Sequence, residues 1–164
     1  MELFELDDLI NDLGIDPTAE QLDLLYAEFK RDFIDSFLNI DGLNVKVILK
    51  NSTLEGFEPY PETFVKLITR DSVGGKRVFD RHRANKIHWI RCILDKRDDD
   101  DITFFQYPDK KNDLRDYYWF KNGGFLVVMK KISPDYLVIT SFHIDSRHNE
   151  EYYEKKLEWF NNEK

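Results

Sequence analysis

Four short segments rich in aromatic and β-branched residues follow one another in the second half of the chain, and they restrict the fold more than any other feature. We predict strands at 102–107, 115–120, 125–132 and 136–143. Asn122, Gly123 and Gly124 separate the second strand from the third. This is a strong hairpin signal, because glycine accepts the positive φ angles that such turns require. Strands joined by hairpins form an antiparallel sheet, so the predicted class is α+β.

Helical periodicity predicts three helices around these strands. Asp16, Pro17 and Thr18 form a helix start, and apolar residues then recur at helical spacing to residue 39, where Asp41 and Gly42 end the pattern. A short helix around 3–13 precedes it. Asp80 caps a central helix that runs to about Leu94. The tail is helical over 150–160.

The segments 43–49 and 64–68 are the remaining predicted strands, because both are rich in β-branched or apolar residues. An aromatic loop containing two prolines lies between them. The predicted architecture is therefore an N-terminal helix, a central helix, a mainly antiparallel sheet of four or more strands, and a C-terminal helix. We expect a single domain over 1–164.

Charge is distributed unevenly along the chain, whose net charge is −8. Residues 1–40 carry 11 acidic and 2 basic side chains, whereas residues 41–97 carry 7 acidic and 12 basic ones. A locally basic middle can bind phosphate even in an acidic protein. The simpler interpretation is that an acidic helix covers a basic neighbour within one fold.

Several classes of protein lack support in the sequence. No stretch approaches the roughly 18 apolar residues of a membrane span, and the acidic N-terminus lacks the basic region of a secretory signal. We expect a cytoplasmic protein with no membrane contact and no cofactor. The single cysteine, Cys92, excludes an intramolecular disulfide and a paired-cysteine zinc site. Phosphate-loop and nucleophile-elbow motifs are absent.

The segment 76–89 combines five Lys or Arg with His82, His88 and interleaved aromatic residues. Arginine binds phosphate through paired hydrogen bonds, histidine transfers protons near neutral pH, and aromatic rings stack on bases. The segment therefore has the residues needed to bind a phosphodiester. The alternative is a basic solvent face whose charges pair with residues 1–40.

A second polar group ends the last predicted strand. Strand alternation places Thr140 and Phe142 on one face and Ser141 and His143 on the other. Arg115 and Tyr118 lie on a strand that is a near neighbour in an antiparallel meander. These side chains and the central helix 80–94 therefore define a predicted cleft.

The central helix with Arg-Ala-Asn-Lys-Ile-His-Trp-Ile, the strand with Tyr-Tyr-Trp and the last strand ending Ile-Thr-Ser-Phe resemble one group of enzymes. These are small metal-independent ribonuclease domains of the barnase-like, EndoU-like, colicin-type and RelE-like toxin superfamily, in particular phage- and polymorphic-toxin-associated members. The resemblance covers about residues 79–143 and leaves residues 1–70 unexplained. It implies RNA cleavage through attack by the 2′-hydroxyl, without a metal.

The resemblance also implies roles for residues of this chain. His88 and His143 are the candidates for general acid and base. Arg83, Lys86 and Arg115 are the candidates for binding phosphate, Thr140 or Ser141 for positioning it, and Tyr118 for stacking on a base. Toxins of this group are usually basic, whereas this chain is acidic.

The alternative function is a non-catalytic binding module on the same scaffold, such as an immunity, antitoxin or phage accessory protein. Surface acids suit a basic protein partner. The two hypotheses differ in one structural expectation. An enzyme should bring His88, His143 and Arg83 into one cleft, whereas a binding module need not do so.

Overall fold

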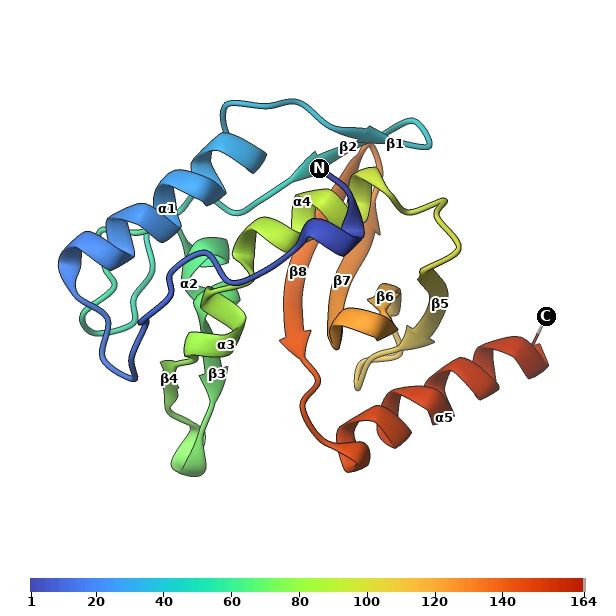
Figure 1. The fold of residues 1–164 in the computed structure, drawn as a ribbon. Helices are drawn as coiled ribbons and strands as arrows, with labels where there is room; N and C mark the ends of the chain where they lie inside the picture. Colours follow the sequence, from blue (N-terminus) through green and yellow to red (C-terminus); the bar gives the residue numbers. More distant parts are fainter. Residues whose placement is uncertain (164) are drawn as a thin grey trace.

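The computed structural model describes residues 1–163 and shows an α+β fold built on a curled six-stranded sheet (Figure 1). The strand order across the sheet is β1-β2-β8-β7-β6-β5. The strands are β1 (Asn39–Ile40), β2 (Leu43–Lys46), β5 (Ile102–Pro108), β6 (Leu114–Phe120), β7 (Phe125–Ile132) and β8 (Asp135–His143). The predicted class and all four predicted strands of the second half are confirmed.

The hairpin at Asn122–Gly124 is also confirmed. It joins β6 to β7, and Phe120 pairs with Phe125 across it. Gly124 has φ +63°, and a Cβ atom added there would lie 2.7 Å from the carbonyl oxygen of Ile144. The Ile144 amide donates to the Gly124 carbonyl at 2.7 Å, so the turn also fixes the chain just after β8.

The sheet is mainly antiparallel, as predicted, and it contains one parallel pair. β2 pairs in parallel with β8, with Asn44 opposite Asp135 and Lys46 opposite Leu137. β5 to β8 form the antiparallel meander that was expected. The parallel pair joins segments that are far apart in the chain, so no turn signal in the sequence marks it.

The first long helix, α1 (Ala19–Phe33), begins where predicted and ends earlier. Thr18 accepts a hydrogen bond from the Gln21 amide, while the Gln21 side chain accepts one from the Thr18 amide. The prediction that the helix continues to residue 39 was wrong. Asp41 and Gly42 instead form the turn between β1 and β2, both with positive φ. Only one 3₁₀ turn, Leu3–Glu5, occupies the predicted short helix at 3–13.

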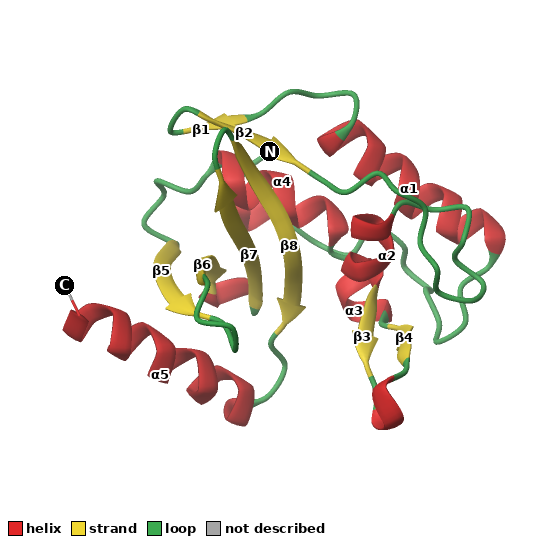
Figure 2. Ribbon diagram, turned by 180° about the vertical axis from the view of Figure 1, so that it is seen from behind, coloured by secondary structure: helices red, strands yellow, loops and turns green. Residues whose placement is uncertain are grey.

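The segment 64–68 lies in a helix, α2 (Glu62–Ile68), so the predicted strand was wrong. Pro61 precedes its first residue and is the N-cap. The helix is buried almost all round, which removes the amphipathic pattern that would identify it. It leads into a small hairpin, β3 (Thr69–Asp71) and β4 (Arg77–Phe79), which projects from the body of the molecule (Figure 2).

The predicted central helix consists of two helices, α3 (Arg81–Ala84) and α4 (Ile87–Asp95). The predicted cap is confirmed, because the Asp80 carboxylate accepts hydrogen bonds from the amides of His82 and Arg83. The residue at the break between the two helices, Asn85, binds the N-terminal segment of the chain. The Asn85 side chain donates to the carbonyl of Ile10 and accepts from the Ile10 amide, which fastens the N-terminal segment to the break.

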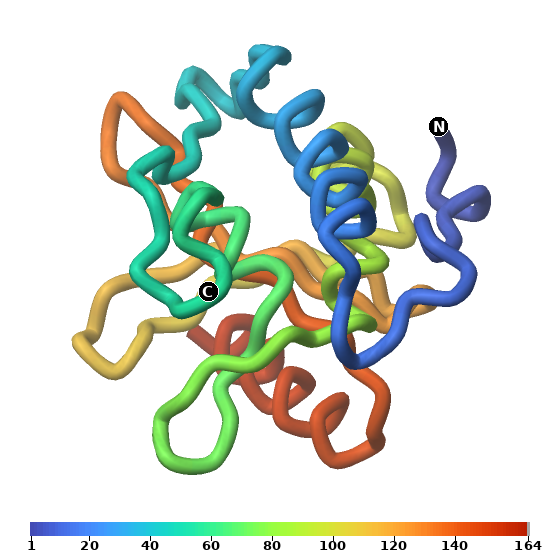
Figure 3. The backbone as a smooth tube through the Cα atoms, turned by 90° about the vertical axis from the view of Figure 1, so that its left-hand side faces the viewer, coloured from blue at the N-terminus to red at the C-terminus, as the bar shows by residue number. Residues whose placement is uncertain are grey.

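Each face of the sheet has its own core. The face with Phe125, Val127 and Met129 packs under α1, α2 and α4. The opposite face, with Trp119 and Leu126, is covered by the C-terminal helix α5 (Arg147–Glu163). Figure 3 shows the N-terminal segment running beside α4, where the Trp89 indole donates to the Asp7 carbonyl at 2.9 Å. Within residues 1–163, no helix is long and apolar enough to cross a membrane.

Candidate functional site

Two histidine rings, His82 and His143, stack at the end of β8 with their centroids 5.1 Å apart and their planes 23° from parallel. They line a cavity of about 440 Å³ with Arg83, which the sequence analysis had chosen. We call this cavity the histidine-pair pocket. Its other lining residues are Arg70, Asp80, Phe142, Asp145 and Asn149.

Local structure fixes the backbone of both histidines. His82 lies in the first turn of α3, where its amide donates to the Asp80 carboxylate at 3.0 Å. His143 is the last residue of β8 and pairs with Phe125 of β7. A one-residue register shift lies between Val128 and Met129, where Thr140 and Val138 are the respective partners and Ile139 is left over. Beyond the shift, Ser141 and His143 face the same side, as alternation predicted.

The surroundings of His143 favour its neutral form. Burial is the main cause of a lowered pKa for His143, and the positive charge of Lys86 and the neighbouring His82 lower it further. Its Nδ1 atom is shielded from solvent and has no hydrogen-bond partner among residues 1–163. Because an imidazolium must donate from both nitrogens, this atom also disfavours the charged form.

Two arginines border the pair. Arg83 is buried, donates through Nη1 to the Thr69 carbonyl at 2.5 Å, and stacks its guanidinium 4.6 Å above the Phe142 ring. Arg70 is 53 % exposed, and its Nε lies 3.8 Å from the Asp80 carboxylate. Arg83 therefore helps to form the wall, whereas Arg70 is the more exposed of the two and its contact to Asp80 is long. Because the carboxylates of Asp80 and Asp145 also line the cavity, an anion such as phosphate would have to be bound by the arginines and the imidazoles.

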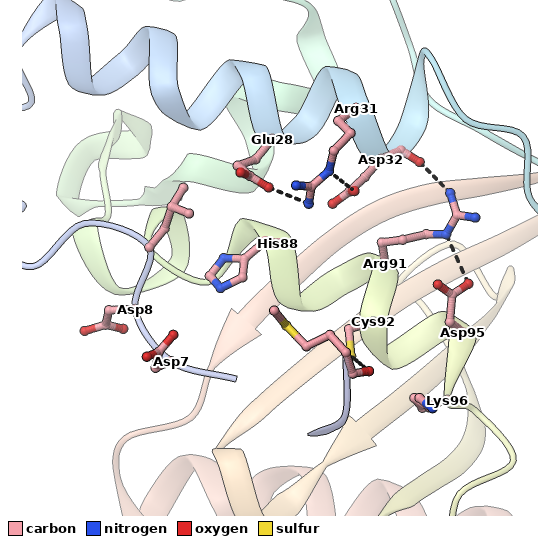
Figure 4. A pocket seen from close by; sticks show the side chains of 12 residues that line it. Asp7, Asp8, Glu28, Arg31, Asp32, His88, Arg91, Cys92, Asp95 and Lys96 are labelled. Carbon is pink, nitrogen blue, oxygen red and sulfur yellow. Dashed lines mark hydrogen bonds and ion pairs between the residues drawn. The ribbon is translucent and has the colours of Figure 1, made fainter. Parts of the chain in front are cut away.

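His88 lies elsewhere. It lines a cleft of about 730 Å³ between the N-terminal segment, α1 and α4 (Figure 4). We call this the acidic cleft, after its five carboxylates, Asp7, Asp8, Glu28, Asp32 and Asp95. No residue lines both cavities. The structure thus places His143 and Arg83 together and separates His88 from them.

Burial also lowers the pKa of His88, while the negative charge of Glu28 opposes the shift. Cys92, one helical turn further along α4, lines the same cleft. Its thiol lies 3.5 Å from the Met1 carbonyl, and burial raises its pKa. The thiolate needed for nucleophilic attack is therefore disfavoured, which agrees with a structural cysteine.

The other cations chosen from the sequence are paired within the protein. Lys86 is buried and its ammonium lies 3.0 Å from the Asp8 carboxylate. Arg115 contacts Asp109 through Nε and Nη2, at 3.1 and 2.8 Å. Sheet register also places Arg115 toward the end of the sheet opposite His143. Neither cation extends into the histidine-pair pocket.

The three hydroxyl residues chosen from the sequence are buried as well. The Tyr118 phenol shares a hydrogen bond of 2.8 Å with Tyr136, which in turn donates to Asp116. Ser141 is fully buried opposite Val127, and Thr140 lies opposite Val128 on the other face. Tyr118 is thus not exposed for stacking on a base, and Thr140 and Ser141 do not line the pocket.

Sequence reasoning missed His82, Arg70 and Asn149 as pocket residues. His82 lies in the dense basic segment, and its position two residues after the capping Asp80 was a usable signal. Arg70 and Asn149 come from a small hairpin and from α5, and nothing in the sequence connects them to His143.

Across residues 1–163, no three His, Cys, Asp or Glu side chains are grouped so that they could hold a metal ion. No model of a known protein family matches the chain, and neither do any curated protein or solved structure.

Proposed function

We propose that this protein is an endoribonuclease that cleaves RNA through its own 2′-hydroxyl, with His82 and His143 as the acid–base pair. The stack of these two imidazoles in a pocket bordered by Arg70 and Arg83 is the observation that carries the proposal. The resemblance of residues 79–143 to metal-independent ribonucleases supports the same reaction. His82 takes the role that the sequence analysis gave to His88.

His143 is the proposed general base, because its surroundings favour the neutral imidazole. It removes the proton from the 2′-hydroxyl, and the 2′-oxygen then attacks phosphorus. The bond to the 5′-oxygen breaks, and the imidazolium of His82 protonates that leaving group. The products are a 2′,3′-cyclic phosphate and a free 5′-hydroxyl, so atoms and charge balance.

The arginines stabilise the charge that develops on the phosphorane. Arg70 is exposed and reaches the ligand directly, whereas Arg83 is fixed by Thr69 and Phe142 and contributes its field from the wall. Fixed cations of this kind stabilise a transition state without reorganising during the reaction.

The test is cleavage of total RNA and of labelled single-stranded oligoribonucleotides, with and without chelator. We expect cleavage in both conditions and a cyclic phosphate at the new 3′ end. His82→Ala and His143→Ala should each lower the rate about 100-fold or more. His88→Ala should leave the cleavage rate within about threefold of that of the unchanged protein, because His88 lies in the other cavity.

Intact RNA under all these conditions would overturn the proposal. So would a loss of cleavage on adding chelator, or an equal loss in the His88→Ala variant. An oligonucleotide with one 2′-deoxy residue at the cleaved position is the substrate control, because it lacks the attacking hydroxyl.

The second candidate is a non-catalytic binding module, and one observation favours it. Lys86 and Arg115, which an RNA-binding enzyme would direct at phosphate, are paired with the protein's own Asp8 and Asp109. Under this hypothesis RNA stays intact and the acidic surface binds a basic protein. The cleavage assay above distinguishes the two candidates.

A further inference from the structure

The acidic cleft has an unsatisfied acceptor in its wall. The Asp32 side chain is only 8 % exposed, and Figure 4 shows it directed from α1 into the space above α4. Its Oδ1 accepts from Arg31 Nε at 3.1 Å, while Oδ2 is shielded from solvent and has no hydrogen-bond partner in the described chain. Burial raises the pKa of this carboxyl, so folding leaves it incompletely stabilised.

The Arg31 side chain is exposed to solvent, although it forms ion pairs with two carboxylates. Its guanidinium lies 2.5 Å from Glu28 and 3.1 Å from Asp32, yet its side chain is 63 % exposed. Exposed ion pairs contribute little free energy, because water competes with them and ordering a long side chain costs entropy. Arg31 can therefore leave its place when another cation takes over its contacts, since only the buried Asp32 carboxylate requires a partner, and its departure uncovers both carboxylates.

The charge of the cleft selects the kind of ligand. Its three cationic side chains all have carboxylate partners: Arg31 as above, Arg91 with Asp95, and Lys96 with Glu2. The five carboxylates outnumber these three side chains, although Lys86 also pairs with Asp8 and the N-terminal residue Met1 lies in the lining. Among the described residues, an anion would find no unpaired cationic side chain here, whereas a cation would find acceptors.

We propose that the acidic cleft is a binding site for the guanidinium group of a ligand. Until that ligand binds, the guanidinium of Arg31 occupies the same position between Glu28 and Asp32. A planar guanidinium matches two carboxylates at once and has more donors than Arg31 uses here. One guanidinium then replaces another between Glu28 and Asp32, and the incoming group also reaches Oδ2. The inference is independent of RNA cleavage, because the two cavities share no residue.

The ligand's guanidinium has two sources, a small free cation or an arginine side chain of a basic protein segment. Agmatine serves as the probe for the first and an acetylated, amidated Gly-Arg-Gly peptide for the second. The same peptide with citrulline in place of arginine is the neutral control. Binding is followed by calorimetry and by the NMR shifts of His88, which lines the cleft.

We expect the arginine peptide to bind at least tenfold more tightly than the citrulline peptide. Tighter binding of the peptide than of agmatine identifies a protein segment as the source, and the reverse identifies a small cation. Asp32→Asn, which keeps the shape and removes the charge, should weaken binding about tenfold. Glu28→Gln is the second variant of this kind.

Arg31→Ala gives the sharpest result, because it removes the internal competitor and should tighten binding at least threefold. Lys30→Ala is its matched control, since it removes the same charge from the adjacent residue, whose partner Asp35 lies outside the cleft. Equal gains in the two variants would show an effect of net charge and overturn the proposal. Equal affinity for the citrulline peptide and the arginine peptide would also overturn the proposal. So would NMR shifts of His88 that added phosphate causes and neither guanidinium probe causes.

Discussion

The histidine-pair pocket and the acidic cleft each contain a half-buried histidine with a lowered pKa, but the charges around the two histidines differ. The positive charge of Lys86 reinforces the effect of burial on the pKa of His143, while Asp145 and Asp80 oppose it. The negative charge of Glu28 opposes the effect of burial on the pKa of His88. The largest effect of a neighbouring charge thus comes from a cation at His143 and from a carboxylate at His88.

The difference shows that the type of residue alone does not define a site in this molecule. α3 and α4 are consecutive helices, yet the break between them directs His82 and His88 to different cavities. The basic segment 76–89 is thus divided between two surfaces. Each surface combines with a different distant segment, β8 and α5 in one case and α1 in the other.

Phe29→Ala should have the largest effect on stability, because it removes a fully buried ring between α1 and its neighbours. The Phe29 ring contacts Tyr26, Phe33 and Phe64. We expect a loss of about 3–5 kcal/mol in the free energy of unfolding, measured with denaturant. Leu24→Ala, on the exposed face of the same helix, should change it by less than about 0.5 kcal/mol.

This pair of variants tests how the two cavities are built. α1 supplies a wall of the acidic cleft and none of the histidine-pair pocket. At a temperature where Phe29→Ala remains folded, His88 shifts should therefore change in the NMR spectrum while those of His143 stay in place. A loss below about 1 kcal/mol would mean that α1 is not packed as described.

Asp80→Ala should have an intermediate effect and act on the histidine-pair pocket. The Asp80 carboxylate caps α3 and holds the amide of His82. Loss of an N-cap costs about 0.5–2 kcal/mol. We expect that loss in denaturant unfolding, together with slower RNA cleavage if the proposed function holds. Asp80→Asn keeps a capping oxygen and should retain most of the stability. An equal loss of unfolding free energy in Asp80→Ala and Asp80→Asn would show that the charge of Asp80, rather than its hydrogen bonds, stabilises the helix.

Stability should fall gently as the pH drops below about 6.5, the ordinary pKa of histidine. Both His88 and His143 have lowered pKa values in the folded protein, so the unfolded chain binds protons first as the pH falls. The stability is complete above 6.5 and is lost as the pH falls through the folded pKa values. Denaturant unfolding at a series of pH values measures the slope.

The His88→Gln and His143→Gln variants separate the two contributions to that slope. Each should flatten the profile, and the double variant should flatten it most. An unchanged slope in the double variant would show that other groups titrate here. Asp32 works in the opposite direction, because its raised pKa favours folding as the pH falls toward the ordinary range of a carboxyl.

Local signals in the sequence were sufficient for much of the fold. Gly124, Thr18 and Asp80 each mark a turn or cap through their own chemistry, and the structure places those elements where they were predicted. The segment 64–68 was misread because a short run that is apolar except for Lys66 fits a buried helix as well as a strand. The parallel pairing of β2 with β8 depends on contacts that no local pattern reveals.

The candidate site was less predictable than the fold. The structure places His143 and Arg83, both chosen from the sequence, in the lining of one pocket. His88 was also chosen, and the sequence predicted one continuous helix, whereas the break at Asn85 separates His88 from the pocket that contains His82. The partners that occupy Lys86 and Arg115 lie in separate parts of the chain or in a loop, and pairing of this kind requires coordinates.

The parallel pair of β2 and β8 has a consequence for synthesis on the ribosome. β2 pairs with Asp135, Tyr136 and Leu137, so β2 cannot take its final place before those residues have emerged. Until then Leu43 and Val45, which pack against the core in the finished protein, lack their partner strand. Closing so long a loop is entropically costly and slow compared with forming the local hairpins. For most of its synthesis the nascent chain therefore carries β2 as an unpaired strand, and the β1–β2 end of the sheet closes only when the last strand has been made.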